Sequence, residues 1–359
     1  MRAACVIVLC LISLPAFAKI EGKKFIEYGW DCPDTAYVRQ HVADMEKIPF
    51  DGLVIRVMTP KGGGSTDSLG WKVWAKEKFK PEDYAQAVAD LKATKFKRLK
   101  SNFIQVISAP GNIDWFDPEW PTVAHNAAAL ARVAKLSGCK GIMFDPEEYM
   151  VPVWSFLNMP EKQRAGHSFE DYQAKVRERG REFIRAINKE YPNITILALY
   201  GPSMTHIFAK DKPLRDAYYS LLASFYDGVC EAATSKTTLV DGYEFSYGYL
   251  TPQQFKDGRK AVLDAVDKST NPDALRKHLR VGFGVWADWN SGQIGWHPED
   301  LTKNYFSPAA LRTSLNYALD TCDRYVWVYS ERFQWWQGSA PKEFIEALGL
   351  SKTGPAPAE

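Results

Sequence analysis

The sequence of 359 residues has few cysteines, six in all, and almost no net charge, +2 at pH 7. No run of lysine and arginine is interleaved with aromatic residues, so a nucleic-acid partner is not expected. The cysteines are widely spaced and match no metal-binding motif. Four of them lie beyond residue 18, and we expect buried free thiols there, although export would permit disulfides: Cys32, Cys139, Cys230 and Cys322.

Long apolar runs are also scarce, and the one at the start of the chain has a particular form. Residues 1–18, "MRAACVIVLCLISLPAFA", contain one arginine, an apolar run and a final Ala-Phe-Ala. This order is typical of a secretory signal peptide, so we expect a secreted or periplasmic protein. A membrane anchor, the alternative, would need about 20 apolar residues. No later run is long enough to predict a membrane span.

The rest of the chain predicts one α/β domain. Hydrophobic residues make up 46% of the sequence and charged residues 25%, which suits a sizeable core. Amphipathic helical patterns alternate with eight short β-rich runs: 24–31, 52–60, 102–110, 141–149, 194–201, 241–249, 281–289 and 325–333. This order predicts a (β/α)8 TIM barrel over residues 19–350, followed by a disordered tail at 351–359. A doubly wound sheet would need a glycine-rich turn after the first strand, where "GWDCPDT" stands instead.

Polar residues gather at the ends of the predicted strands. In a TIM barrel, the carboxyl ends of the strands carry the chemistry. Asp31, Asp145, Asp288 and Glu331 close the first, fourth, seventh and eighth runs. Long insertions containing tryptophan follow the second and fourth runs, as expected of loops that wall a cleft.

Side-chain alternation along each strand predicts which of these residues face the barrel axis. The predicted inward and rim set combines acids with aromatic residues: Asp145, Glu147, Glu244, Tyr247, Trp286, Asp288, Trp327, Tyr329 and Glu331. Histidine and cysteine are missing from it, which argues against a zinc site and against a Ser-His-Asp triad. No cofactor or metal is predicted.

Acids beside aromatic rings suit cleavage of a glycosidic bond. One carboxyl group must donate a proton to the leaving oxygen, while a second, ionised, stabilises or attacks the developing cation. Asp145 and Glu147 are two residues apart on the predicted fourth strand, about 7 Å between Cα atoms. Repulsion at that distance keeps one of them protonated near neutral pH. A solvated acidic loop and a calcium site are the alternatives.

The fourth run, "KGIMFDPEEY", resembles the active strand of chitinase-type (family eighteen) glycosidases, D-G-x-D-x-D-x-E. "FSYGY" and "YVWVYSE" resemble two further strands of that family. The resemblance implies that Glu147 is the general acid/base and that Asp145 orients the acetamido group of the substrate. It places sugar-contacting roles at Tyr247 and Tyr329. Met143 and Gly248 stand where the family pattern has acids.

Other assignments remain open at this point. Glu331 or Asp288 could act as the nucleophile opposite Glu147 without help from an acetamido group. Further residues are predicted to bind substrate: Asp31, Glu148, Tyr149, Trp286, Trp327 and Trp335. Asp31 could instead cap the first helix, although Asp34 is better placed, and Trp335 could pack over the barrel. A non-catalytic carbohydrate-binding barrel and a metal-assisted hydrolase are the competing functions.

Overall fold

The computed structural model describes residues 22–59, 67–164, 166–290 and 295–352. The predicted signal peptide lies outside these residues, as do residues 353–359 of the tail predicted over 351–359. Helix α11 (Lys342–Ser351) continues to a position just past the predicted domain end at residue 350. Lys352 then donates a hydrogen bond to Asp51, 2.6 Å from Nζ to Oδ2.

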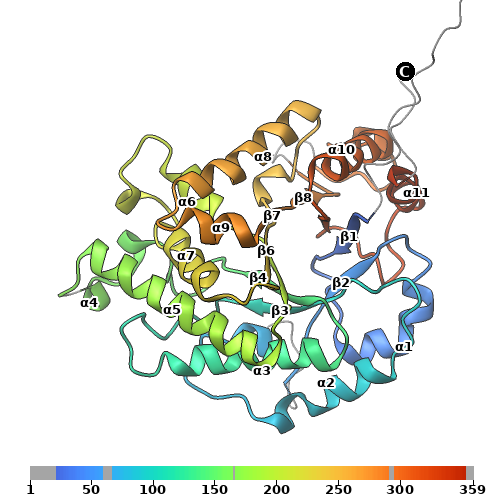
Figure 1. Ribbon diagram of the computed structural model, residues 1–359. Coiled ribbons are helices and arrows are strands. Elements are labelled where there is room, and N and C mark those ends of the chain that lie inside the picture. The colour runs from blue at the N-terminus through green and yellow to red at the C-terminus, as the bar shows by residue number, and fades with distance from the viewer. Residues whose placement is uncertain (1–21, 60–66, 165, 291–294, 353–359) are drawn as a thin grey trace, which may run out of the picture.

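The strands form one parallel sheet that closes into a barrel (Figure 1). In the described residues, the strands are β1 (Lys24–Glu27), β2 (Gly52–Ile55), β3 (Phe103–Ile107), β4 (Gly141–Asp145), β5 (Thr195–Ala198), β6 (Thr238–Asp241), β7 (Leu279–Val281), β8 (Phe283–Trp286) and β9 (Tyr325–Tyr329). The order is β7-β6-β5-β4-β3-β2-β1-β9-β8, so β7 and β8 are the edges. These two strands are separated only by Gly282 and together take the place of one barrel strand. The predicted TIM barrel is confirmed.

Helices cover the outside of the sheet (Figure 1). They are α1 (Thr35–Met45), α2 (Pro81–Ala93), α3 (Pro121–Leu136), α4 (Glu161–Arg164), α5 (Phe169–Glu190), α6 (Ser203–Ala209), α7 (Leu222–Ala232), α8 (Pro252–Asp267), α9 (Pro272–His278), α10 (Pro308–Thr321) and α11. The local sequence determines where several of these helices begin. Ser168 and Asp171 form a capping box at α5, and Asp34 accepts a hydrogen bond from the Tyr37 N–H at α1, as expected of the better cap.

The barrel has two apolar layers, which follow from the alternation of side chains along the strands. Ile142 and Phe144 of β4 pack between sheet and helices, whereas Met143 lies inside the barrel. In β9, Val328 faces the helices and Trp327 faces the interior. The predicted inward and outward faces of these strands are confirmed.

The predicted strand ends were wrong in a consistent way: most observed strands stop three or four residues earlier. The largest error concerns the sixth strand, predicted at 241–249 and observed as β6 (Thr238–Asp241). The Asp241 carboxylate accepts the backbone N–H of Tyr243, 3.1 Å from Oδ1, which turns the chain out of the sheet. A short 3-10 helix (Glu244–Ser246) follows. The aromatic alternation of "DGYEFSYGY" therefore belongs to a loop.

Two other predictions concern cysteines and loops. The four cysteines beyond the predicted signal peptide are free and buried, as predicted.

The long segment after β4 contains a 3-10 helix (Phe156–Asn158) and α4, and the described residues of the segment after β2 include a 3-10 helix (Leu69–Lys72). Within the described residues, the structure has no helix that is both long enough and apolar enough to cross a membrane.

Candidate active site

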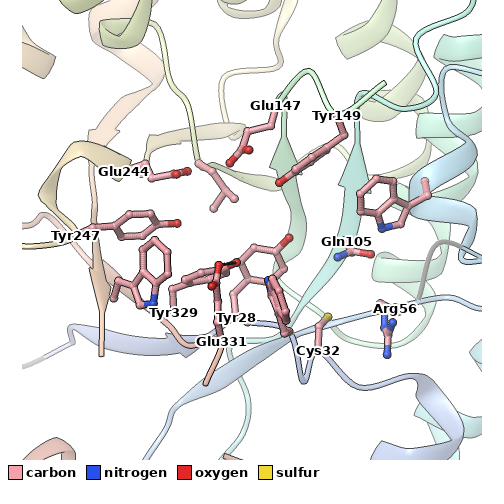
Figure 2. A pocket seen from close by; sticks show the side chains of 15 residues that line it. Tyr28, Cys32, Arg56, Gln105, Glu147, Tyr149, Glu244, Tyr247, Tyr329 and Glu331 are labelled. Atoms are coloured by element: carbon pink, nitrogen blue, oxygen red, sulfur yellow. Dashed lines mark hydrogen bonds between the residues drawn. The ribbon is translucent and has the colours of Figure 1, made fainter. Parts of the chain in front are cut away.

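A cavity of about 590 Å³ opens at the carboxyl end of the barrel strands (Figure 2). Residues from around the whole barrel line it: Tyr28, Gly29, Trp30, Cys32, Arg56, Trp71, Gln105, Glu147, Tyr149, Leu199, Glu244, Tyr247, Trp286, Tyr329 and Glu331. This is the barrel end at which TIM-barrel enzymes carry their chemistry. Seven of the sequence-predicted site residues are thus brought together: Glu147, Tyr149, Glu244, Tyr247, Trp286, Tyr329 and Glu331.

Asp145 is the last residue of β4 and is fully buried behind the cavity wall. Its carboxylate accepts hydrogen bonds from the Tyr149 hydroxyl (3.0 Å) and the Tyr28 hydroxyl (3.4 Å) on Oδ2, and from the Glu147 N–H (3.0 Å) on Oδ1. Burial raises the pKa of Asp145 to about 6, and these three donors limit the rise. The donors therefore favour the ionised form of Asp145 at neutral pH.

Glu147 lies in the loop after Pro146 and lines the cavity. Because β4 has already ended, the strand spacing used in the sequence prediction does not apply. The two acids are instead linked by the turn in which Asp145 accepts the N–H of Glu147. Burial and the nearby Asp145 charge raise the pKa of Glu147 to about 8. Glu147 can thus keep its proton at neutral pH.

Glu244 provides a third carboxyl group on the neighbouring side of the cavity. It follows Tyr243, which has a left-handed backbone conformation, φ 42°, so that the chain turns sharply after β6. Figure 2 shows the Glu147 and Glu244 carboxyl groups pointing toward each other. Burial and the charges of Glu147 and Asp145 raise the pKa of Glu244 well above its usual value. The sequence placed Glu244 in the site, but on a strand that does not exist there.

Aromatic rings form the side of the cavity below these acids. Tyr247 stacks on Tyr329 with ring centroids 5.6 Å apart and planes at 22°. Trp286 meets Tyr329 edge-on at 5.1 Å. The Tyr329 hydroxyl donates to Glu331, 3.1 Å to Oε1, and this bond partly offsets the rise that burial causes in the pKa of Glu331. Flat apolar faces beside carboxyl groups suit the binding of a sugar ring.

Several lining residues were not predicted. Tyr28 and Trp30 follow β1, Gln105 is in β3, and Trp71 comes from the segment after β2. Trp30 is 70% exposed, and Trp71 contacts Tyr149 with ring centroids 5.0 Å apart. Tyr28 follows the first strand directly, so the strand-end rule could have identified it.

Asp288 was predicted to act in the site, but it has a structural role. It is 2% exposed, and its Oδ1 accepts the Trp286 Nε1–H at 2.6 Å. Its Oδ2 accepts the backbone N–H groups of Glu331 and Arg332. The carboxylate therefore joins the ends of β8 and β9 and positions Trp286 and Glu331 rather than facing the cavity.

Two predicted substrate-binding tryptophans are also buried away from the cavity. Trp327 is fully buried inside the barrel, where its Nε1–H donates to the Gly242 carbonyl at 2.8 Å. Trp335 packs in the core, 5.1 Å from Phe50 between ring centroids. Both predictions were wrong because sequence alone did not distinguish a tryptophan that fills the core from one that meets a ligand.

Glu148 was predicted to bind substrate, but its carboxylate instead stabilises the loop after β4. Its Oε1 accepts the backbone N–H groups of Trp154 (2.6 Å) and Ser155 (2.9 Å), and its Oε2 accepts the Ser155 hydroxyl (2.7 Å). Two adjacent glutamates thus have different roles: Glu147 lines the cavity, and Glu148 holds the loop that carries it.

Asp31, predicted either to bind substrate or to cap the first helix, does neither. It is 5% exposed, and its Oδ2 accepts the Trp336 N–H at 3.1 Å. It faces Glu27, which is fully buried and accepts the Trp336 Nε1–H at 2.8 Å. A hydrogen bond between the two carboxyl groups requires one shared proton, and burial together with the Asp31 charge raises the pKa of Glu27 well above its usual value.

The buried pair predicts a pH-dependent stability. Because the folded state holds the Glu27 proton more tightly than the unfolded chain, this contribution is complete below about pH 4.5 and is lost as pH rises toward the folded pKa. Gln at position 27 keeps the bond to Trp336 without titrating. We expect Glu27→Gln to increase the free energy of unfolding by about 1–3 kcal/mol at about pH 8 and to change it little at about pH 4.

Urea unfolding at both pH values measures this difference. Glu27→Ala is the matched control, because it removes both the charge and the acceptor for Trp336, and we expect it to be less stable than Glu27→Gln at both pH values. A Glu27→Gln protein that is no more stable than the parent at the higher pH would contradict the shared proton.

The positions of the acids also bear on metal binding. Among the residues that the structure describes, no three histidine, cysteine, aspartate or glutamate side chains are grouped so that they could hold a metal ion.

Solved structures similar to this chain include two glycoside hydrolases and one epimerase. A glycoside hydrolase family 5 enzyme from Prevotella bryantii B14 superimposes with a TM-score of 0.50 at 8% identity, over 94% of this chain and 98% of that chain. A glucosidase from Croceicoccus marinus gives 0.47 at 11% identity, over 89% of this chain but only 62% of that chain. A 3-keto-D-glucoside 4-epimerase from E. coli gives 0.46 at 12% identity, over 92% and 99%.

At 8% identity, the similarity to the Prevotella enzyme supports the barrel fold alone. The two lower TM-scores are too low to support any conclusion about this chain. No protein-family model matches the sequence, and a search of curated proteins found no match. TIM barrels host many unrelated activities, so the function depends on the chemistry of the cavity itself.

Proposed function

We propose that the protein is a glycoside hydrolase and that Glu147 is its proton donor. The observation that carries the proposal is a carboxyl group with a pKa raised to about 8, in an aromatic-lined cavity at the carboxyl end of the barrel. A glycosidase needs one acid that keeps its proton at neutral pH until the bond to the leaving oxygen breaks. Glu147 meets this requirement by burial and by the neighbouring Asp145 charge.

Asp145 and Glu331 have different roles in this proposal. Asp145 is enclosed, so it acts as a positioning residue that raises the pKa of Glu147 and fixes its loop. Glu331 lines the cavity on the side away from Glu147 (Figure 2). It supplies the second carboxylate, which attacks the anomeric carbon in a retaining reaction or activates water in an inverting one. The anomeric configuration of the first product distinguishes the two.

The proposal predicts a bell-shaped pH profile. Glu331 must be ionised to attack the anomeric carbon or to activate water, so activity falls at acid pH, and Glu147 must be protonated, so activity falls as pH rises through about 8. The upper limb belongs to the coupled pair of Asp145 and Glu147 rather than to Glu147 alone. Initial rates from acid to alkaline pH measure the profile, and full activity retained well above the upper limb would contradict Glu147 as the acid.

A screen of the purified protein against polysaccharides, oligosaccharides and glycoprotein glycans tests the function itself. Release of reducing ends from at least one glycan supports a hydrolase. Binding without release from any glycan would instead support a non-catalytic carbohydrate-binding barrel. That second candidate is favoured by the buried Met143, which stands where the chitinase-type pattern has an acid. If residues 1–18 direct export, as we propose, the glycan is extracytoplasmic.

A further inference from the structure

We propose that the sugar bound beside Glu147 carries a free, positively charged amino group, and that Glu244 binds this group. The inference rests on the proposed function and names its substrate class. It differs from what the chitinase-type resemblance implies, since an acetamido group is neutral. The charge distribution in the cavity and one unpaired carboxyl oxygen carry the argument.

Acidic side chains outnumber basic ones in the lining of the cavity. Among its described lining residues, three are acids, Glu147, Glu244 and Glu331, while Arg56 is basic. A fourth acid, Asp145, lies directly behind Glu147. Figure 2 shows Arg56 on the far side of the cavity from Glu147 and Glu244. A positively charged group at the Glu244 side would lie near the ionised Asp145 and would favour ionisation of Glu244, whereas a negatively charged ligand would oppose it.

The Glu244 carboxyl group is also incompletely bonded. The Tyr200 and Tyr247 hydroxyls act on its pKa from nearby, yet its Oε2 is enclosed and has no hydrogen-bond partner among the described residues. A buried polar atom without a partner is costly and uncommon. An ammonium group provides three donors and a charge, so it can bond Oε2 and at the same time favour the ionised form of Glu244. A hydroxyl group could bond Oε2 but carries no charge that would favour this ionisation.

Proton release on binding follows from this assignment. The groups that face Glu244 are Glu147 and Asp145 from the end of β4, Tyr200 after β5 and Tyr247 on its own segment. Burial and these nearby acids oppose the ionisation of Glu244 in the free protein, so its pKa is raised well above the usual value. A bound ammonium group favours the ionised form, so binding should release a proton from Glu244. Binding should therefore strengthen as pH rises, as long as the sugar amine itself remains protonated.

Isothermal titration calorimetry on the parent protein tests the proposal with three sugar series, of gluco, galacto and manno configuration. Each series comprises the 2-amino sugar, its N-acetyl derivative and the parent hexose, none of which has a glycosidic bond to cleave. We expect one amino sugar to bind roughly 10-fold more tightly than its two partners, with proton release in buffers of different ionisation heat. In Glu244→Gln this preference should fall to within about 3-fold.

Glu331→Gln is the matched control, because it removes an acid from the same cavity without touching Glu244, and it should keep the preference. Equal or weaker binding of every amino sugar, or no binding of any of them at millimolar concentration, would overturn the inference. A preference that survives in Glu244→Gln but not in Glu331→Gln would do the same. Hydrolysis of neutral glycans by the parent protein would leave the proposed function standing in each of these cases.

Discussion

Glu147→Gln is expected to lower kcat on an unactivated glycan by about 10³-fold while leaving the affinity for that glycan within about 3-fold. Gln keeps the shape and a hydrogen-bonding group at the cavity wall but has no proton to give to the leaving oxygen. The loss therefore falls on the chemical step rather than on binding. Steady-state kinetics, together with calorimetric binding of an oligosaccharide, separate the two effects.

Glu27→Gln is the control for this experiment, since Glu27 is a buried acid at the same end of the barrel but outside the cavity. We expect its activity to equal that of the parent at neutral pH. A Glu147→Gln protein that is folded by circular dichroism and retains a third or more of the parent kcat would exclude Glu147 as the proton donor. A kcat loss shared equally by both variants would point to a general effect of removing buried charge.

Asp145→Asn is expected to lower kcat at neutral pH by roughly 10²-fold and to move the alkaline limb of the pH profile toward lower pH. The Asp145 charge contributes to the raised pKa of Glu147, so removing it lets Glu147 lose its proton earlier. Asn keeps an oxygen that can accept the Glu147 N–H and the Tyr149 hydroxyl. The pH dependence of kcat/KM measures the shift.

A purely structural role for Asp145 would give a different result, namely lower activity with unchanged limbs. Asp90→Asn is the matched control, because Asp90 is a buried aspartate of α2 that accepts a hydrogen bond from Arg39 of α1 at 3.1 Å and does not line the cavity. Its pH profile should be that of the parent. An alkaline limb that stays in place in Asp145→Asn would contradict the proposed electrostatic link to Glu147.

The fold was predictable because its signals are local and repeated. Each strand is a short apolar run whose side chains alternate between the two buried layers, as Ile142, Met143 and Phe144 do. Each long helix has apolar residues at a helical period along one face. Strand ends were less predictable. Asp145 and Asp241 each accept a hydrogen bond from the backbone N–H of the residue two positions later, and the chain turns out of the sheet there. The alternating pattern of the sequence nevertheless continues past both turns, so the sequence alone predicts longer strands.

The candidate site was only partly predictable. Glu147 and Glu331 follow strands at the carboxyl end of the barrel, so the strand-end rule was enough to find them. The rule failed for Asp288, because backbone N–H groups from a neighbouring strand end occupy its carboxylate. The prediction that Trp335 binds substrate failed for a related reason, because packing against Phe50, far away in the sequence, decides the position of its ring. Contacts between residues distant in sequence leave no pattern in a single sequence.

A leaving-group series on Glu147→Gln tests the central claim most directly. Aryl glycosides of the accepted sugar are hydrolysed by the parent and the variant, and kcat/KM is compared as the phenol becomes more acidic. If Glu147 donates the proton, the parent-to-variant ratio should fall from about 10³ for the poorest leaving group to about 10 or less for 2,4-dinitrophenol, which needs no proton. A ratio that stays constant across the series would show that Glu147 is not the acid.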